Sequence, residues 1–296
     1  MRAPSPRSQH IRAIIQAALN EDLPHGDITT EALFPDAVFA RAVVVANEGM
    51  TLAGLGIAHQ VFREIDPSLK IKNSRKDGET VRPNTTLFII EGDARSILKG
   101  ERVALNFLQH LSGISTLTAR FCKAVKGYST KILDTRKTTP GLRVLQKWAV
   151  RLGGGTNHRY SLSDGILIKD NHLALLQSQG LGIEDACHLS QKRRPHHRKI
   201  TVEAETFEQV RMAIKGNPDV ILLDNMTPKM VAKAVKLIKG LALVEVSGGI
   251  TLKNVRHMAT AGANFISIGA LTHSAPAMNL SLNFSIPKKR TRRLPR

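Results

Sequence analysis

The sequence is poor in cysteine and in aromatic residues, and each shortage excludes a class of protein. The 296 residues include two cysteines, Cys122 and Cys187, which lie far apart in the chain. This count excludes a disulfide framework and gives no sign of a zinc site with paired cysteines. Aromatic residues make up 4% of the chain and do not alternate with its basic segments. This argues against a surface that stacks nucleic-acid bases.

Long hydrophobic runs are missing as well. No apolar stretch approaches the roughly 20 residues that span a membrane. Segment 1–7 is not followed by the apolar core of a secretory signal. Hydrophobic residues still make up 42% of the chain, a share typical of globular proteins. We therefore expect a globular protein with a cytoplasmic location.

Acidic residues are scarce relative to basic ones. The chain has 43 Lys and Arg against 24 Asp and Glu, a net charge of +19. Such an excess is typical of proteins that bind nucleic acids, anionic membranes or anionic small molecules. Segments 192–199 and 288–296 hold eleven of the cations. We interpret them as a solvated loop and tail, and keep nucleic-acid binding as the alternative.

The first hundred residues predict a small α+β unit, since one stretch has helical spacing and three short runs are rich in Val and Ile. The helix is expected at residues 9–19 and the strands at 41–46, 69–72 and 87–91. Two helices follow at 96–111 and 114–125, separated by a break near Ser112-Gly113.

From about Lys131 onward, short apolar runs alternate with helical stretches. The expected strands are 132–133, 166–168, 200–204, 220–223, 243–246 and 265–268, and the clearest helices are 208–214, 229–238 and 252–261. The strand-end residues Glu203, Asp224, Ser247 and Gly269 are 21, 23 and 22 residues apart. This spacing fits repeated βα units with a parallel sheet, and we favour a barrel. Barrel enzymes carry their chemistry at the C-terminal ends of the strands.

Residues 133–172 concentrate positive charge beside glycines. The cationic or potentially cationic side chains are Arg136, Lys137, Arg143, His158, Arg159 and Lys169. A packed core has no use for so many cations, whereas a pocket for a multiply charged anion has. Thr139 and Pro140 can be explained as the N-cap and first residue of a helix at 142–150. Capping leaves Arg136 and Lys137 unexplained.

The next segment, Gly153-Gly-Gly-Thr-Asn-His-Arg159, indicates a carboxylate clamp. The three glycines point to unusual backbone angles or to close approach of a ligand. Arg159 offers a two-pronged guanidinium, and His158 offers a hydrogen-bond donor. Lys169 ends a predicted buried strand, where we interpret it as a phosphate ligand.

Two carboxylates, Glu203 and Asp224, end successive predicted strands. They could pair with Lys or Arg inside the protein, or hold Mg²⁺ together with a phosphate. Glu205 is the alternative to Glu203, because the inward phase of that strand is not determined by the sequence. The small residues at 247–250 and 269–274 follow the last two strands and predict backbone nests for phosphate.

The chain resembles the quinolinate phosphoribosyltransferase family over nearly its whole length. The matching segments are Glu21-Asp-Leu-Pro-His-Gly-Asp-Ile-Thr29, Gly100-Glu-Arg-Val-Ala-Leu-Asn-Phe-Leu-Gln109, Leu133-Asp-Thr-Arg-Lys-Thr-Thr-Pro-Gly-Leu-Arg143, Gly153–Arg159, Ile168-Lys-Asp-Asn-His172, Ser247-Gly-Gly249 and Ser267-Ile-Gly-Ala-Leu-Thr-His-Ser274. Gln146, Trp148 and Ser161 depart from the family pattern, and we expect them to flank the site without touching the chemistry.

The resemblance implies an α/β protein of two domains. An N-terminal α/β sandwich would cover residues 1–113, joined by 275–296, and an open, atypical α/β barrel of about six or seven parallel strands would cover 114–274. It also implies a homodimer or larger assembly with shared active sites. The implied reaction joins quinolinate to phosphoribosyl pyrophosphate with Mg²⁺ and yields nicotinate mononucleotide, pyrophosphate and CO₂.

The resemblance also assigns roles to residues. Arg102 would reach the partner's site and would hold the quinolinate carboxylates there with Arg136, Lys137, His158 and Arg159, beside Thr135. Lys137 and Lys169 would face the phosphates, and Glu203 and Asp224 the ribose and the metal. The backbones of Ser247, Gly248, Gly249, Gly269, Ala270 and Leu271 would bind the 5′-phosphate. The catalytic residues would be Lys137, Lys169, Glu203 and Asp224.

Two competing hypotheses remain among enzymes. A related phosphoribosyltransferase could act on another heterocyclic acid, although four predicted carboxylate ligands favour a dicarboxylate. A phosphate-binding barrel enzyme of the aldolase type would instead use Lys169 to form a Schiff base.

Overall fold

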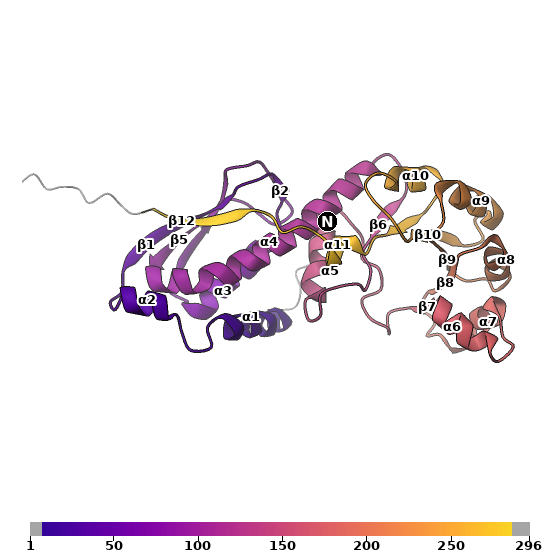
Figure 1. Cartoon of the computed structure of the whole chain (residues 1–296), viewed down its shortest axis with the longest axis horizontal. Helices are drawn as coiled ribbons and strands as arrows, with labels where there is room; N and C mark the ends of the chain where they lie inside the picture. The colour runs from indigo at the N-terminus through magenta and orange to yellow at the C-terminus, as the bar shows by residue number, and fades with distance from the viewer. Residues whose placement is uncertain (1–7, 286–296) are drawn as a thin grey trace, which may run out of the picture. The chain divides into compact units, whose positions relative to one another are not determined.

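The computed structural model describes residues 8–285, and the chain forms two compact units (Figure 1). Within this range, unit 1 runs to Thr116 and resumes at Pro276, and unit 2 is Leu117–Ala275. The sequence analysis divides the chain after residues 113 and 274 instead. Helix α4 (Ala94–Ala124) begins in unit 1 and ends in unit 2. The N-terminal segment 1–7 and the basic tail 288–296 lie outside the described residues.

Unit 1 is built on a four-stranded antiparallel sheet with the strand order β12-β1-β5-β3. Its strands are β1 (Phe39–Ala46), β3 (Lys70–Asn73), β5 (Thr85–Asp93) and β12 (Leu280–Ser285), with a separate pair of β2 (Met50–Thr51) and β4 (Thr80–Val81). Its helices, besides α4, are α1 (Ser8–Asp22), α2 (Ile28–Leu33) and α3 (Leu55–Ile65). Strand β12 pairs with β1, so the end of the described chain completes the first sheet.

The core of unit 1 lies between α3 and the sheet. Val61 and Phe62 of α3 are fully buried, as are Phe88 and Ile90 of β5. The Phe62 and Phe88 rings meet edge to face, with centroids 6.3 Å apart. This burial of large apolar side chains is the main stabilising contribution in the unit.

The predicted helix break at Ser112-Gly113 is wrong, because α4 continues through both residues. The Ser112 hydroxyl bonds both the N–H and the C=O of Ala53, at 3.1 and 3.2 Å. A Cβ on Gly113 would lie 2.0 Å from the carbonyl oxygen of Pro276. These small residues allow other segments to pack closely against the helix. This packing outweighs the roughly 1 kcal/mol by which a glycine destabilises a helix.

One half-buried histidine should make the stability of unit 1 depend on pH. His59 stacks edge to face on Phe88, and its Nε2 has no hydrogen-bond partner. Burial, with a smaller contribution from Arg63, lowers its pKa from 6.5 to about 4. Below pH 6.5 the His59 side chain therefore takes up a proton in the unfolded chain. In the folded protein it stays neutral until the pH approaches 4. The free energy of unfolding should fall by about 2–3 kcal/mol between pH 6.5 and 4.

Urea unfolding at successive pH values checks this expectation. His59→Leu should remove that part of the pH dependence, whereas His10→Leu, at an exposed position of α1, should leave it in place. Equal slopes for the wild type and His59→Leu would show that another group is responsible.

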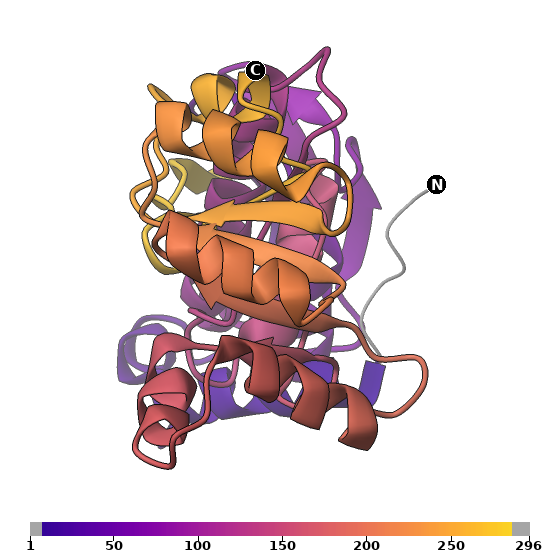
Figure 2. The ribbon, with the colours of Figure 1, turned by 90° about the vertical axis from the view of Figure 1, so that its right-hand side faces the viewer.

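Unit 2 is an open parallel sheet of six strands in the order β6-β11-β10-β9-β8-β7, as predicted. The strands are β6 (Lys131–Leu133), β7 (Ile166–Ile168), β8 (Ile200–Ala204), β9 (Val220–Asp224), β10 (Leu243–Ser247) and β11 (Phe265–Ser267). Its helices are α5 (Arg143–Leu152), α6 (Asp170–Gln177), α7 (Ile183–Arg193), α8 (Phe207–Lys215), α9 (Pro228–Ile238), α10 (Val255–Thr260) and α11 (Ala270–His273). Figure 2 shows helices of this unit lying along the outer side of its strands.

Local sequence signals explain most of these elements. The apolar run Val220–Leu223 is buried throughout and ends on the polar Asp224, as expected for a central parallel strand. Thr206 caps α8, and Thr227 with Pro228 begins α9. Parallel strands place all their C-terminal ends at one edge. Among the described residues, no helix is long and apolar enough to cross a membrane.

The predicted N-cap of the helix after β6 is wrong. Helix α5 begins at Arg143, preceded by Leu142, which makes no side-chain cap. Thr139 instead pairs with Gln146: the Thr139 N–H donates to Oε1, and the Gln146 amide donates to the Thr139 hydroxyl. The turn at Gly141, with φ +79°, delays the helix, so the loop is held by a side chain of the helix rather than by a cap.

Candidate active site

A cavity of about 550 Å³ lies at the C-terminal ends of the strands of unit 2. Thirteen of the predicted site residues line it: Thr135, Arg136, Lys137, His158, Arg159, Lys169, Glu203, Asp224, Ser247, Gly248, Gly249, Gly269 and Ala270. Two do not. Leu271 is buried in α11, and Arg102 lies on the part of α4 that belongs to unit 1. The role of Arg102 in a partner's site stays a prediction.

The most unusual feature of the cavity is a pair of arginines without acidic partners. Among the described residues, neither Arg136 nor Arg159 forms an ion pair, and the Arg136 Nε is buried without a hydrogen bond. Arg159 donates to the carbonyl of Gly165 at 2.9 Å. Desolvation, and then the positive charge of Arg136, lower the pKa of Arg159. Two half-buried guanidinium groups that repel each other suit an anion with more than one negative charge.

Lys137 projects from the loop after β6. Its backbone is fixed, because the Thr272 hydroxyl donates to its carbonyl at 2.7 Å and its N–H donates to the Thr135 hydroxyl at 3.0 Å. A Cβ on Gly269 would lie 3.1 Å from the Lys137 Cδ. The glycine therefore leaves room for the lysine stem, and the ammonium group is exposed for a phosphate.

Lys169 and Glu203 form an ion pair with Nζ and Oε1 3.0 Å apart. Glu203 lines the cavity, whereas Glu205 is exposed and lies at the capping end of α8. The position of Glu203 in the cavity lining therefore favours it over Glu205, the alternative that the sequence left open. The Lys169 Nζ is thus engaged by a carboxylate of the same cavity, which disfavours the Schiff-base role considered for it.

The carboxylates of Glu203 and Asp224 suit a cation that is bound jointly by the protein and by a substrate. Glu203 and Asp224 line the cavity from the neighbouring strands β8 and β9. Among the described residues, no group of three or more His, Cys, Asp or Glu is arranged to hold a metal. Mg²⁺ commonly binds through one or two carboxylates and completes its shell with substrate phosphates and water. The donor set present suits that arrangement.

The part of the cavity lining that follows β10 consists of small residues, Ser247, Gly248 and Gly249. Gly248 has φ +84° and Gly249 has φ +60°, angles that favour glycine. A Cβ on Gly248 would lie 2.1 Å from Oδ1 of Asn225. The N–H of Asn225 donates to the carbonyl of Ser247 at 3.0 Å, so the ends of β9 and β10 hold this turn in place.

A buried ion pair supports the arginine side of the cavity. Lys147 and Asp134 are 3% and 0% exposed and form a short contact. Asp134 also accepts from the Asn157 amide at 2.5 Å and from the His158 N–H at 2.8 Å. Lys147 donates to the His158 carbonyl at 3.1 Å. Burial raises the pKa of Asp134 and lowers that of Lys147, while their mutual attraction opposes both shifts.

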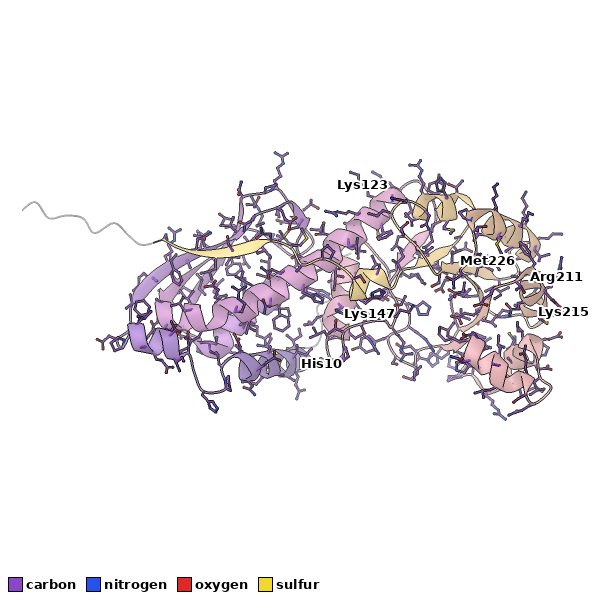
Figure 3. The ribbon with its side chains drawn as sticks, viewed as in Figure 1. His10, Lys123, Lys147, Arg211, Lys215 and Met226 are labelled. Atoms are coloured by element: carbon purple, nitrogen blue, oxygen red, sulfur yellow. The ribbon has the colours of Figure 1, made fainter. Side chains whose placement is uncertain are left out.

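Lys147→Met should destabilise the protein by about 3–5 kcal/mol, because it leaves the Asp134 carboxylate buried without a charge partner. Lys147 lies on α5 (Figure 3), and Arg151→Met, on the exposed side of the same helix, serves as the control with an expected loss of about 0.5 kcal/mol or less. Urea unfolding measures both. Equal losses would show that the pair is not needed for folding.

The triple glycine contributes to packing and does not line the cavity. Gly154 has φ +88°, which confirms the predicted unusual backbone. A Cβ on Gly155 would lie 2.7 Å from Val150 Cγ1 and 2.8 Å from Thr118 Cγ2. The close approach at Gly155 is therefore to the protein itself.

The sequence analysis missed several lining residues. The polar ones are Glu245, Ser267 and His273, and the apolar ones are Leu167, Leu222, Ile250 and Ile268. Glu245 had a usable signal, since it is the one charged residue in the otherwise apolar run 243–246. Strand periodicity also places it on the same face as Ser247. By contrast, Gln146 and Trp148 are buried and do not line the cavity.

Comparisons with known proteins agree over both units. Residues 27–112 and 114–283 match the N-terminal and C-terminal domains described as quinolinate phosphoribosyl transferase. A probable carboxylating nicotinate-nucleotide pyrophosphorylase of Bacillus subtilis is 40% identical over 266 residues, covering 90% of each chain. A chloroplastic enzyme of that name from Arabidopsis thaliana is 39% identical, covering 95% of this chain and 85% of its own. The nicotinate-nucleotide pyrophosphorylase structure from Francisella tularensis superposes with a TM-score of 0.90 at 35% identity, covering 96% of this chain and 99% of its own.

Proposed function

Because the chain belongs to the quinolinate phosphoribosyltransferase family, we propose that it joins quinolinate to phosphoribosyl pyrophosphate. The products are nicotinate mononucleotide, pyrophosphate and CO₂, and the reaction is a pentosyl transfer of de novo NAD biosynthesis. One observation carries the assignment to a dicarboxylate: Arg136 and Arg159 line the same cavity and repel each other, and neither forms an ion pair within residues 8–285. Lys137 and Lys169 provide the cations for phosphate beside them.

Quinolinate has two neighbouring carboxylates, and each guanidinium can bind one through two parallel hydrogen bonds. Arg136 and Arg159 supply these groups from the barrel. Arg102 of the partner subunit would add a third guanidinium group to the site of the same substrate. This arrangement orients the pyridine nitrogen toward the ribose, and correct orientation is a large part of catalysis in a two-substrate reaction.

Phosphoribosyl pyrophosphate occupies the opposite wall. The turns at Ser247–Gly249 and Gly269–Leu271 bind its 5′-phosphate through backbone groups. Glu203 and Asp224 would contact the ribose hydroxyls and would hold a Mg²⁺ ion together with the diphosphate. When bound, that ion neutralises charge on the diphosphate.

The chemistry needs charge stabilisation more than proton transfer. The pyridine nitrogen bonds to C1 of the ribose as the C1–O bond breaks, and its electron pair leaves with pyrophosphate. Lys137 and Lys169 stabilise the negative charge that develops there. The ring nitrogen is then cationic, so the C–C bond to the adjacent carboxylate breaks with loss of CO₂. Its electron pair remains on the ring carbon, which takes a proton from solvent. No general base is assigned.

Release of CO₂ and pyrophosphate from quinolinate, assayed with and without Mg²⁺, tests the proposal. Both products should form in equal amounts and only with the ion. Nicotinic acid lacks the second carboxylate and is the negative control. Equal activity on both acids would assign the protein to another substrate.

We also propose a cytoplasmic homodimer or a larger assembly built on it, without a nucleic-acid or membrane partner. The support is the family resemblance and the absence of Arg102 from the residues that line the described cavity. A subunit exchange experiment, given in the Discussion, tests the shared site directly.

A further inference from the structure

Of the six cationic side chains that the sequence analysis names in residues 133–172, Arg143 alone does not line the cavity. It is the first residue of α5, and within residues 8–285 it forms no ion pair. A positive charge at the N-terminal end of a helix is unfavourable. The contacts that keep Arg143 in this position therefore need explanation.

The guanidinium group of Arg143 bridges two loops of unit 2. Its Nε donates to the Thr138 hydroxyl at 3.0 Å, and its Nη1 donates to the carbonyl of Tyr160 at 3.1 Å. The group also lies over the Tyr160 ring, 6.0 Å from the ring centroid, which is the distance of a cation–π contact. Thr138 lies in the loop after β6, and Tyr160 lies in the loop before β7. One side chain thus connects both loops.

Each end of this bridge leads to an arginine of the cavity. The N–H and the hydroxyl of Thr138 both donate to the carbonyl of Arg136, at 2.9 and 3.4 Å. Tyr160 directly follows Arg159 in the chain. The charges of Arg136 and Arg159 repel each other, and this repulsion favours separation of the two loops. The hydrogen bonds of Arg143 oppose that separation.

Lys137 has contacts of its own, although it lies in the same loop as Thr138. The Thr272 hydroxyl donates to its carbonyl at 2.7 Å, and its N–H donates to the Thr135 hydroxyl at 3.0 Å. Neither contact involves Arg143. Loss of the bridge should therefore disturb the two cavity arginines and leave the phosphate-binding lysine in place.

We propose that Arg143 is a positioning residue that sets the spacing of Arg136 and Arg159 and thereby the affinity for quinolinate. The inference rests on the proposed function for the identity of that substrate. Because Arg143 lies outside the cavity lining, it acts through its two hydrogen bonds rather than by contact with the substrate. Both bonds come from one planar group with donors at fixed angles, a geometry that a lysine ammonium lacks.

A set of substitutions separates the bridge from the charge. Arg143→Lys keeps the positive charge and loses the planar pair of donors, and Arg143→Met loses both. Thr138→Val removes the hydroxyl at one end of the bridge, and Thr138→Ser keeps it as the matched control. Arg151→Met, at an exposed position of α5, is the control for loss of an arginine from this helix.

The first readout is amide hydrogen exchange in the ligand-free protein, measured by mass spectrometry on peptides from segments 135–142 and 158–164. Arg143→Met and Arg143→Lys should exchange about tenfold faster in both segments, the factor expected for loss of one hydrogen bond. Arg151→Met should exchange like the wild type there. This measurement does not depend on activity. A protein inactive on quinolinate would refute the proposed function, whereas unchanged exchange in Arg143→Met would refute the bridge.

The second readout is kinetic. Arg143→Met and Arg143→Lys should each raise the KM for quinolinate about tenfold or more. The KM for phosphoribosyl pyrophosphate and kcat should stay within about threefold, because Lys137 keeps its contacts. A merely structural role would lower the amount of folded enzyme, which lowers kcat and leaves the KM unchanged. Thr138→Ser and Arg151→Met should stay within about twofold in all three constants.

The double variant of Arg143→Met with Thr138→Val tests whether the two residues act through one contact. Thr138→Val alone should raise the KM for quinolinate about threefold or more. In the double variant the KM should be close to that of Arg143→Met alone, because the contact is already lost. A KM that multiplies the two separate effects would show that Arg143 does not act through Thr138.

Two further results would overturn the proposal. One is a wild-type KM for quinolinate in Arg143→Lys together with a raised KM in Arg143→Met, because the charge alone would then be sufficient. The other is a fall in kcat without a rise in this KM. If Arg143→Met does not fold, Arg143→Lys and Thr138→Val decide, since each must raise the KM for quinolinate by itself.

Discussion

Lys137→Ala should lower kcat by about two to three orders of magnitude while the protein stays folded. Its ammonium group is placed to stabilise charge on the departing pyrophosphate, and removal of one such group from a catalytic site typically costs a factor of this size. The side chain is exposed and forms no ion pair within residues 8–285. Its loss therefore leaves the core intact, and urea unfolding should give a free energy close to that of the wild type.

Lys131→Ala is the matched control, because Lys131 is an exposed lysine at the opposite end of β6. It should keep kcat within about twofold of the wild type. Near-normal turnover in Lys137→Ala would show that Lys137 does not stabilise the departing pyrophosphate. If the free energy of unfolding of that variant is much lower than that of the wild type, the loss of activity would be due to loss of folded protein.

Arg102→Ala should lower kcat/KM for quinolinate by about 100-fold or more, the effect of removing one charge from a buried charged contact. A mixture with Lys137→Ala should nevertheless recover activity if the site is shared between subunits. In a mixed dimer, both defects then fall in one site and the other site is intact. After complete exchange of subunits in equal amounts, about a quarter of the wild-type activity should return.

A mixture of Lys137→Ala with Lys169→Ala is the control for this exchange. Both lysines line the same cavity of one chain, so every site of a mixed dimer carries one defect and activity should stay low. Equal exchange in both mixtures is checked with two affinity tags. Failure of the Arg102 mixture to recover, with exchange shown, would place Arg102 outside the partner's site.

The position of the chemistry could be predicted from the sequence because it depends on local signals. Six short apolar runs, each ending on polar or small residues, are the six strands of unit 2, and no strand end differs from the prediction by more than one residue. In a parallel sheet every strand delivers its last residue to the same edge. Arg136, Lys169, Glu203 and Asp224 therefore meet in one cavity although the chain separates them.

Local sequence signals gave wrong predictions at two places where side-chain contacts determine the structure. Ser112-Gly113 reads as a helix break, but Ala53 and Pro276 require small residues there and the helix continues. Thr139 reads as an N-cap, but its partner is the Gln146 side chain. At Ser112-Gly113, contacts with distant segments outweigh a preference of about 1 kcal/mol, and at Thr139 a side chain seven residues further along the chain does so.

By itself, the sequence determined the class of fold, the edge of the sheet that carries the site and the identity of its cations. These follow from the period of apolar residues and from the ends of strands, which are properties of neighbours in the chain. Only the tertiary structure decided that Glu203 rather than Glu205 faces the cavity, that Lys147 pairs with Asp134, and that Glu245 lies beside His158. Alternation along a strand does not say which face is inward, and a hydrogen bond between distant segments exists only once the whole barrel brings them together.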